Sequence, residues 1–184
     1  KIEDGVEDIR LQFELFRTCG GGAPLSCGTW NFERTNVNEL IELTKPFDFT
    51  FCEFDVPSKC CEYFVTVKPL EIDIDSPGGD VVVNNARIVA IAQATKSLDE
   101  CRTLDKKNDC IDCVANQPPE SQIVLECGEG TGNRSFSSGN EPAFQLARVS
   151  IDSTWLCNPM VNIDFSSIVS FNGSGNGRLR YELF

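Results

Sequence analysis

Two heptapeptides near opposite ends of the chain have nearly the same sequence. Residues 10–16 read RLQFELF and residues 178–184 read RLRYELF. Both alternate apolar and polar side chains, which is the period of a strand that buries one face. The apolar positions, which we take as candidates for strand exchange, are Leu11, Phe13, Leu15, Leu179, Tyr181 and Leu183. A domain needs such a strand once, so the chain is either a window across two tandem domains or a subunit with one strand to share.

The composition narrows the function classes. The 184 residues include ten cysteines and no histidine, which removes the commonest general base and metal ligand. Serine and cysteine nucleophiles therefore lack an imidazole partner, and we expect neither enzymatic activity nor a cofactor. The net charge of −12 argues against nucleic acid or an anionic membrane as a partner. No apolar run approaches the length of a membrane span, so no membrane insertion is expected.

The cysteines indicate an oxidising setting. A cysteine content this high without histidine is more typical of disulfides than of zinc, and predicts an extracellular location on a cell or spore surface. The disulfide candidates are Cys19, Cys27, Cys52, Cys60, Cys61, Cys101, Cys110, Cys113, Cys127 and Cys157. The C-x-x-C of Cys110 and Cys113 leaves a zinc or redox site open as a minor alternative. The Lys1 start is neither an initiator methionine nor a signal peptide, so we expect a processed chain or a portion of a longer one.

Short strands and glycine-rich turns organise the rest of the chain. Residues 9–95 contain a series of alternating runs, including a hairpin arm near the start and two predicted core strands, FDFTFC and EYFVTV. Residues 96–120 are charged, with three cysteines and a Pro-Pro pair, and are assigned to a linker. A second β series fills 121–184, and helix is expected at most over 36–43. The predicted fold is all-β, an antiparallel sandwich or jelly roll completed by strand exchange.

Four further motifs have a structural and a functional reading. GEGTGN at 128–133 resembles a phosphate-binding loop, but we expect it to be a turn, because no helix follows it and it lacks GK[ST]. Glu71, Asp73, Asp75 and Asp80 could gather oxygen ligands for calcium, but their spacing matches no known loop and a solvated acidic face is the commoner case. Asn133 and Asn172 begin N-x-S sequons and are candidates for glycosylation.

Several local strings resemble one family, a cysteine-rich domain of unknown function found in clostridial spore-forming bacteria. They are LECG at 125–128, S-x-D-S-T-x-L-C-N-P at 150–159, VNIDFSSIVSF at 161–171, FRTCGGG at 16–22, GTWNFER at 28–34, FDFTFCEF at 47–54, CCEYFVTV at 60–67 and NNARIVAIA at 84–92.

The order of these strings is rotated relative to the family. Members run from the LECG string to the NAR string, which makes residues 1–95 the later half of the family domain and 121–184 the earlier half. The family usually has further cysteines where this chain has Phe54, Pro57 and Trp155, so no disulfide pairing is carried over. The resemblance brings no enzymatic role. By architecture alone, such a sandwich is also similar to subunits of spore appendages and donor-strand pili.

These observations lead to one main functional expectation and one alternative. The main expectation is a structural subunit of an extracellular or spore-surface fibre, a homopolymer that grows head-to-tail by β-strand exchange and is stabilised by disulfides. The alternative is a monomeric secreted binding or adhesion module from a tandem-domain protein. In that case the repeated strand only marks successive domains.

Overall fold

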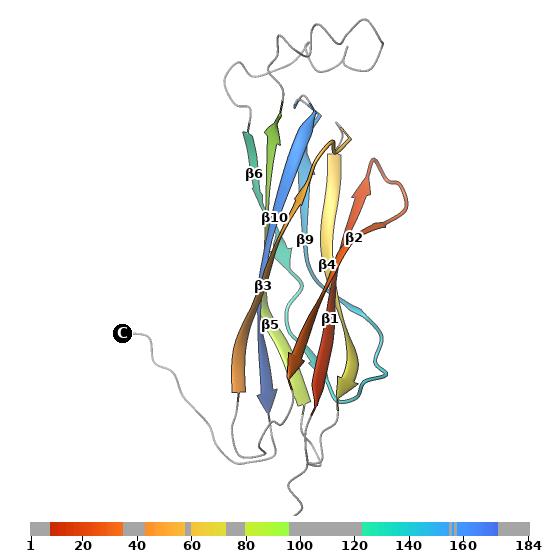
Figure 1. The fold of residues 1–184 in the computed structure, drawn as a ribbon, viewed down its shortest axis with the longest axis vertical. Helices are drawn as coiled ribbons and strands as arrows, with labels where there is room; N and C mark the ends of the chain where they lie inside the picture. Colours follow the sequence, from red (N-terminus) through yellow and green to blue (C-terminus); the bar gives the residue numbers. More distant parts are fainter. Residues whose placement is uncertain are drawn as a thin grey trace, which may run out of the picture.

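The computed structural model describes residues 8–34, 43–57, 60–72, 80–95, 123–154, 156 and 158–172. These residues form two antiparallel sheets packed face to face, so the predicted β-sandwich is confirmed (Figure 1). The long axis of the molecule follows the strands. The helix expected over 36–43 and the linker at 96–120 lie outside the described residues, except that Leu43 begins a strand.

Sheet A has the order β2-β1-β4-β9-β7. Its strands are β1 (Ile9–Cys19), β2 (Leu25–Arg34), β4 (Cys60–Ile72), β7 (Glu129–Gly130) and β9 (Phe144–Asp152). The β1–β2 hairpin is the arm that the turn-rich residues between them predicted. β1 is an interior strand, paired antiparallel with β2 on one side and with β4 on the other.

Sheet B has the order β3-β10-β5-β6, and β8 also pairs with β5. Its strands are β3 (Leu43–Glu53), β5 (Asp80–Ala94), β6 (Ile123–Cys127), β8 (Arg134–Phe136) and β10 (Pro159–Asn172). Each sheet therefore combines strands from before residue 95 with strands from after residue 121. The two halves of the chain complete one sandwich, as the opposite parts of a single domain would.

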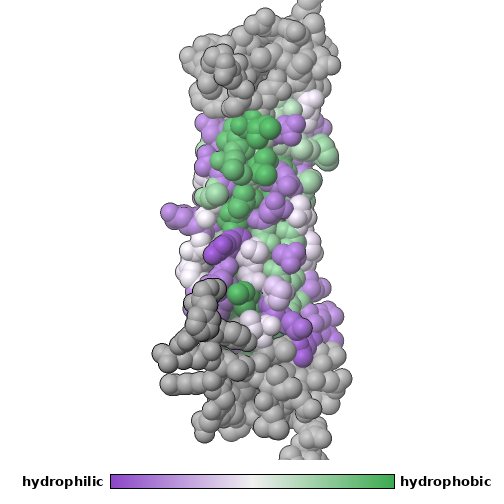
Figure 2. Space-filling model, turned by 90° about the vertical axis from the view of Figure 1, so that its left-hand side faces the viewer, coloured by the Kyte–Doolittle hydropathy of each residue, from purple (hydrophilic) through white to green (hydrophobic). Residues whose placement is uncertain are grey.

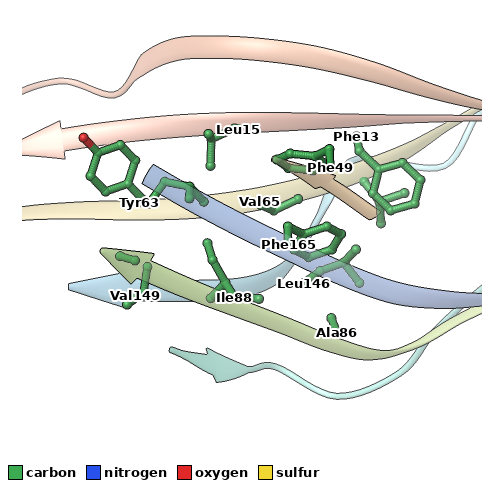
Figure 3. Close-up of a cluster of buried hydrophobic side chains, with 14 of the residues drawn as sticks. Phe13, Leu15, Phe49, Tyr63, Val65, Ala86, Ile88, Leu146, Val149 and Phe165 are labelled. Carbon is green, nitrogen blue, oxygen red and sulfur yellow. The ribbon is translucent and has the colours of Figure 1, made fainter. Parts of the chain in front are cut away.

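The core comes from the inward positions of these alternating strands. Leu11, Phe13 and Leu15 of β1 are fully buried, as are Tyr63, Val65 and Val67 of β4. Figure 3 shows Phe13 and Phe49 toward one end of this cluster and Tyr63 at the other. Period-two burial on both sheets leaves the intervening polar side chains outside, which is the pattern that the sequence predicted.

Two predicted local features need a closer description. The inward face expected for FDFTFC is confirmed, because Phe49 is in the core at 6% exposure and Phe47 and Phe51 pack partly buried against it, although β3 lies at the edge of sheet B. GEGTGN was expected to be a turn, but Glu129–Gly130 form the two-residue strand β7 beside β9. The chain crosses here from β6 of sheet B to β7 of sheet A.

The backbone conformation explains an asparagine in the NNAR motif at 84–87. Asn85 has a positive φ of 51° in the middle of β5. The register of β5 against β10 shifts at the same place, between Ser166 and Ile168. Asparagine adopts the left-handed region more readily than most residues, so it suits the extra residue of a β-bulge.

Candidate strand-exchange and cysteine sites

The strand that the C-terminal heptapeptide copies has no vacancy in its own sandwich. Phe13 of β1 is 0% exposed, and its ring lies 4.1 Å from that of Phe47 and 6.0 Å from that of Phe165. Leu11 and Leu15 are also 0% exposed. Of the six strand-exchange candidates, these three are therefore core residues of an occupied position. The other three, Leu179, Tyr181 and Leu183, lie outside the described residues.

One disulfide is present among the described residues. Cys19, at the end of β1, is bonded to Cys61 of β4, and the two residues are directly opposite each other in the strand register. Their Cα atoms are 4.1 Å apart across a sequence separation of 42 residues. The bond fastens β1 covalently to its neighbour, so it closes the β1 position at the end opposite Ile9.

The remaining cysteine candidates divide into two groups. Cys27, Cys52, Cys60 and Cys127 are free thiols, of which all but Cys27 are exposed. The Cys52 thiol donates to Asn162 Oδ1 over 3.0 Å. Cys101, Cys110, Cys113 and Cys157 lie outside the described residues, so the predicted roles of the linker cysteines stay predictions.

A polar cluster closes the end of the core beside the disulfide. Arg17 of β1 forms an ion pair with Glu53 of β3, and the Tyr63 hydroxyl donates to the same carboxylate over 3.0 Å. Burial and the negative charge of Glu53 raise the pKa of Tyr63. Burial and, to a smaller extent, the negative charge of Glu53 also raise the pKa of the Cys27 thiol to about 11. The cluster connects the two sheets and favours the protonated forms of the Tyr63 hydroxyl and the Cys27 thiol.

Sequence reasoning did not single out this cluster, although the strand period contains a signal for it. Arg17 follows the inward-facing Leu15 by two residues, so it lies on the same face of β1. Glu53 follows Phe51 by two residues and likewise lies on the inward face of β3. A basic and an acidic residue at the inward ends of two apolar strands predict an ion pair between those strands. The missing information was that the two strands face each other.

The open side of the sandwich is covered by aromatic side chains from its two edge strands. In the described part of the chain, β2 and β3 each have a neighbour on one side only. The Trp30 ring stacks on that of Phe49 at 3.8 Å, and the Phe32 ring meets that of Phe47 edge-on at 6.2 Å. Trp30 and Phe32 are only partly buried. We call this row of Trp30, Phe32, Phe47, Phe49 and Phe51 the aromatic seam.

A second exposed apolar region lies at the opposite edge of sheet B. Ile123 and Leu125 of β6 are 54% and 60% exposed. Figure 2 shows an apolar strip on the side of the molecule where β6 lies. Leu125 is paired in register with Ile91, and the exposed thiol of Cys127 ends the same strand.

The outer face of sheet A has a groove of about 380 Å³. The rings of Phe16 and Phe64, which both line it, stack with their centroids 5.2 Å apart. Its lining is Gln12, Glu14, Phe16, Pro24, Phe64, Thr66, Lys68 and Ala143. Apolar and polar side chains are thus mixed along this outer sheet face.

The remaining sequence candidates are placed as follows. Asn133 is exposed in a loop, whereas only the backbone of Asn172, at the end of β10, is described. Glu71 pairs with Arg10 at 3.4 Å, and Asp80 accepts a hydrogen bond from Ser135. Asp73 and Asp75 lie outside the described residues. Within the described ranges, no three cysteine or acidic side chains come together as a metal site.

The fold defines the class of protein, an antiparallel two-sheet β-sandwich with a cross-strand disulfide. The chain belongs to the family described as domain of unknown function DUF4489, which it matches over residues 3–93 and 121–184. These two segments contain every described strand except for Ala94, the last residue of β5. No curated protein and no solved structure matches the chain. In the part of the chain that the structure describes, no helix is long and apolar enough to cross a membrane.

Proposed function

We propose that this chain is a structural subunit of an extracellular fibre on a cell or spore surface. Subunits polymerise by donating the 178–184 strand to a neighbour, and disulfides stabilise the assembly. The role is structural rather than catalytic. We refer to residues 178–184 as the donor strand.

One observation carries this proposal. The donor strand copies β1, and β1 already fills an interior position of sheet A with its own fully buried side chains. A second strand with the same apolar face therefore needs another place to bury Leu179, Tyr181 and Leu183. Unpaired strand edges bind an added strand through backbone hydrogen bonds. A heterologous contact of this kind propagates into a filament unless its rotation closes a ring.

Electron microscopy of the native protein tests the proposal. We expect filaments from the unmodified chain and only short or single particles after Leu179→Asp, Tyr181→Asp and Leu183→Asp together, because three carboxylates cannot be buried on one strand face. The matched control is Ser174→Asp, Asn176→Asp and Gly177→Asp, which adds the same charge to the preceding residues. Filaments of normal length from the first variant would contradict strand donation.

A second function is favoured by the groove on the outer face of sheet A. Its size and mixed lining fit the alternative of a secreted binding or adhesion module. That alternative predicts a monomer at all concentrations in light scattering. It also predicts that Phe16→Ala and Phe64→Ala leave the particle size unchanged but abolish ligand binding.

A further inference from the structure

We call the place where a subunit binds a donor strand the acceptor site. Its assignment rests on the proposed function and goes one step beyond it. Two positions suit a strand that resembles β1. The donor strand could replace β1 between β2 and β4, or it could add to the free edge of β2. We infer that the donor strand of a second copy binds along the free edge of β2, over the aromatic seam, and that β1 stays in place.

The side chains of β2 are complementary to the apolar face that β1 and the donor strand share. Along its paired edge, β2 places Phe32 opposite Leu11, Trp30 opposite Phe13 and Gly28 opposite Leu15. Its free edge presents the same inward side chains in the same order. A donor strand running antiparallel to β2 would place Leu179, Tyr181 and Leu183 beside these three residues. A strand with the sequence of β1 therefore fits either edge of β2.

The seam also has apolar surface to bury. Trp30 and Phe32 of β2 and Phe47 and Phe51 of β3 are only partly buried. Added inner side chains at the β2 edge would cover the exposed parts of these rings. The outer side chains match as well, because Arg178 would lie beside Glu33, the residue that β1 places opposite Arg10.

The two positions at which the heptapeptides differ, Gln12 against Arg180 and Phe13 against Tyr181, disfavour the β1 position for the donor strand. Tyr181 would replace Phe13, whose fully buried ring packs against Phe47 and Phe165, so a hydroxyl would enter an aromatic environment. At the β2 edge, the tyrosine would lie beside the partly buried Trp30, where its hydroxyl can reach water.

The other difference is a matter of charge. Arg180 corresponds to Gln12, which lies opposite Lys68 of β4 in the register. Two cations directly opposite each other destabilise a strand pair. On the free edge of β2, the same arginine would lie beside Asn31, the partner of Gln12 on that strand. Both substitutions therefore favour the edge over replacement of β1.

The disulfide also favours the β2 edge. The Cys19–Cys61 bond holds the end of β1 against β4, so an oxidised subunit cannot release β1 to make room for the donor strand. The free edge of β2 requires no strand to leave. Assembly at this edge is compatible with the disulfide and with the oxidising setting that it indicates.

The chain path leaves the donor open to either copy. Residues 173–177 separate Asn172, the last residue of β10, from the donor strand. The six Cα steps from 172 to 178 span at most about 20 Å. Within one sandwich the chain would pass the start of β3, which is paired with β10, and reach β2 in the other sheet, a path of about one strand spacing and one sheet spacing. We assign the donor to a second copy because the proposed function requires strand donation between subunits, and isotope mixing separates the two cases.

Photo-crosslinking of the full chain tests this inference. We place a benzophenone amino acid at position 181, mix ¹⁴N and ¹⁵N copies, irradiate the assembled protein and identify the linked peptides by mass spectrometry. The expected products join residue 181 to residues 25–34 of the other isotope. Links to Val65, Val67 or Phe165, which surround the β1 position, would overturn the β2 assignment. Links to 25–34 within one copy would overturn the second-copy donor.

Two sets of variants check the result independently of the probe. Tyr181→Phe with Arg180→Gln makes the donor strand identical to residues 10–16. Replacement of β1 predicts faster assembly of this variant, whereas the β2 edge predicts no acceleration. Cys19→Ser with Cys61→Ser releases β1, and likewise should not increase the assembly rate by more than about twofold if the edge is the acceptor. A tenfold increase in either variant would overturn the inference.

These outcomes separate the inference from the proposed function. If the unmodified chain forms no filaments, the fibre proposal fails and the acceptor site fails with it. If filaments form and the links map to the β1 position, only the acceptor assignment is wrong.

Discussion

Tyr63 of β4 donates its hydroxyl proton to Glu53 of β3 over 3.0 Å, which joins sheet A to sheet B by a side-chain hydrogen bond. Tyr63 is 0% exposed, and the acceptor is the carboxylate that also pairs with Arg17. The apolar core therefore ends at this side in a hydrogen-bonded polar cluster rather than in solvent-exposed strand ends.

Removing this hydroxyl should weaken the sandwich. Tyr63→Phe keeps the ring but leaves one oxygen of Glu53 without its donor, and hydrogen bonds to charged groups contribute about 1.5–3 kcal/mol. We expect the free energy of unfolding, measured with urea, to fall by roughly that amount. Tyr181→Phe, which removes the chain's other tyrosine hydroxyl, is the control. Equal stability of Tyr63→Phe and the unmodified chain would contradict the role of the bond.

The disulfide should contribute to stability to a comparable degree. Cys19→Ser with Cys61→Ser removes a cross-link that closes a separation of 42 residues. Bridges of this kind typically contribute about 2–4 kcal/mol. We expect a loss of that size by urea denaturation under non-reducing conditions, and none when both proteins are measured with reductant. Cys52→Ser, which changes an exposed thiol, should have little effect under either condition.

Much of the strand pattern could be predicted from the sequence, because period-two burial is a local property. The alternation in 10–16 and in EYFVTV correctly placed Phe13 and Val65 in the core. The same alternation in FDFTFC correctly placed Phe49 in the core, but it did not show that β3 is an edge strand. Alternation reports that one face is apolar, and says nothing of how many neighbours a strand has.

The relationships between distant strands were not predictable in the same way. Ten cysteines allow many pairings, and the bond of Cys19 to Cys61 depends on the register of β1 against β4. The meeting of Arg17 with Glu53 depends on which strands of the two sheets face each other. Each residue has a local signal, but the partner is fixed only by the tertiary arrangement.

The Cys27 thiol should be unreactive compared with an ordinary cysteine. Its pKa is raised from 9.0 to about 11 by burial and by the Glu53 carboxylate. At pH 8 about one molecule in a thousand then has the reactive thiolate, against about one in ten for an unperturbed thiol. We expect iodoacetamide to modify the exposed Cys52 and Cys127 at least tenfold faster, as followed by peptide mass spectrometry. Modification of Cys27 at the same rate would contradict the buried environment.

The same shift predicts a loss of stability at high pH. A thiol whose pKa is higher in the folded state than in the unfolded state favours folding while it is protonated. This contribution is fully present below pH 9 and is lost as the pH rises through about 11. We expect the pH dependence of the unfolding free energy between pH 9 and 11 to be shallower in Cys27→Ala than in the unmodified chain. Identical slopes would show that Cys27 does not contribute.

Gly128 should be the least replaceable of the glycines at a strand boundary. It lies where the chain leaves β6 in sheet B and enters β7 in sheet A, and its N–H donates to the Ile88 carbonyl over 2.8 Å. A β-carbon there would lie 2.2 Å from the Arg148 carbonyl oxygen and 2.4 Å from Ile88 Cγ2, so atoms from both sheets would be in its way. Neither sheet can move without disturbing its own strand pairing.

Gly128→Ala should therefore cost more than a substitution in a loop. Overpacking of this kind typically costs about 1–3 kcal/mol. We expect a loss in that range by urea denaturation, together with faster hydrogen exchange of the β6 amides, because β6 must move away from β5 to make room. Gly22→Ala is the matched control, since its new β-carbon would meet only the Cys19 carbonyl oxygen at 3.3 Å. If both variants lose the same stability and the β6 amides exchange at unchanged rates, the close crossing between the sheets is not what requires glycine at position 128.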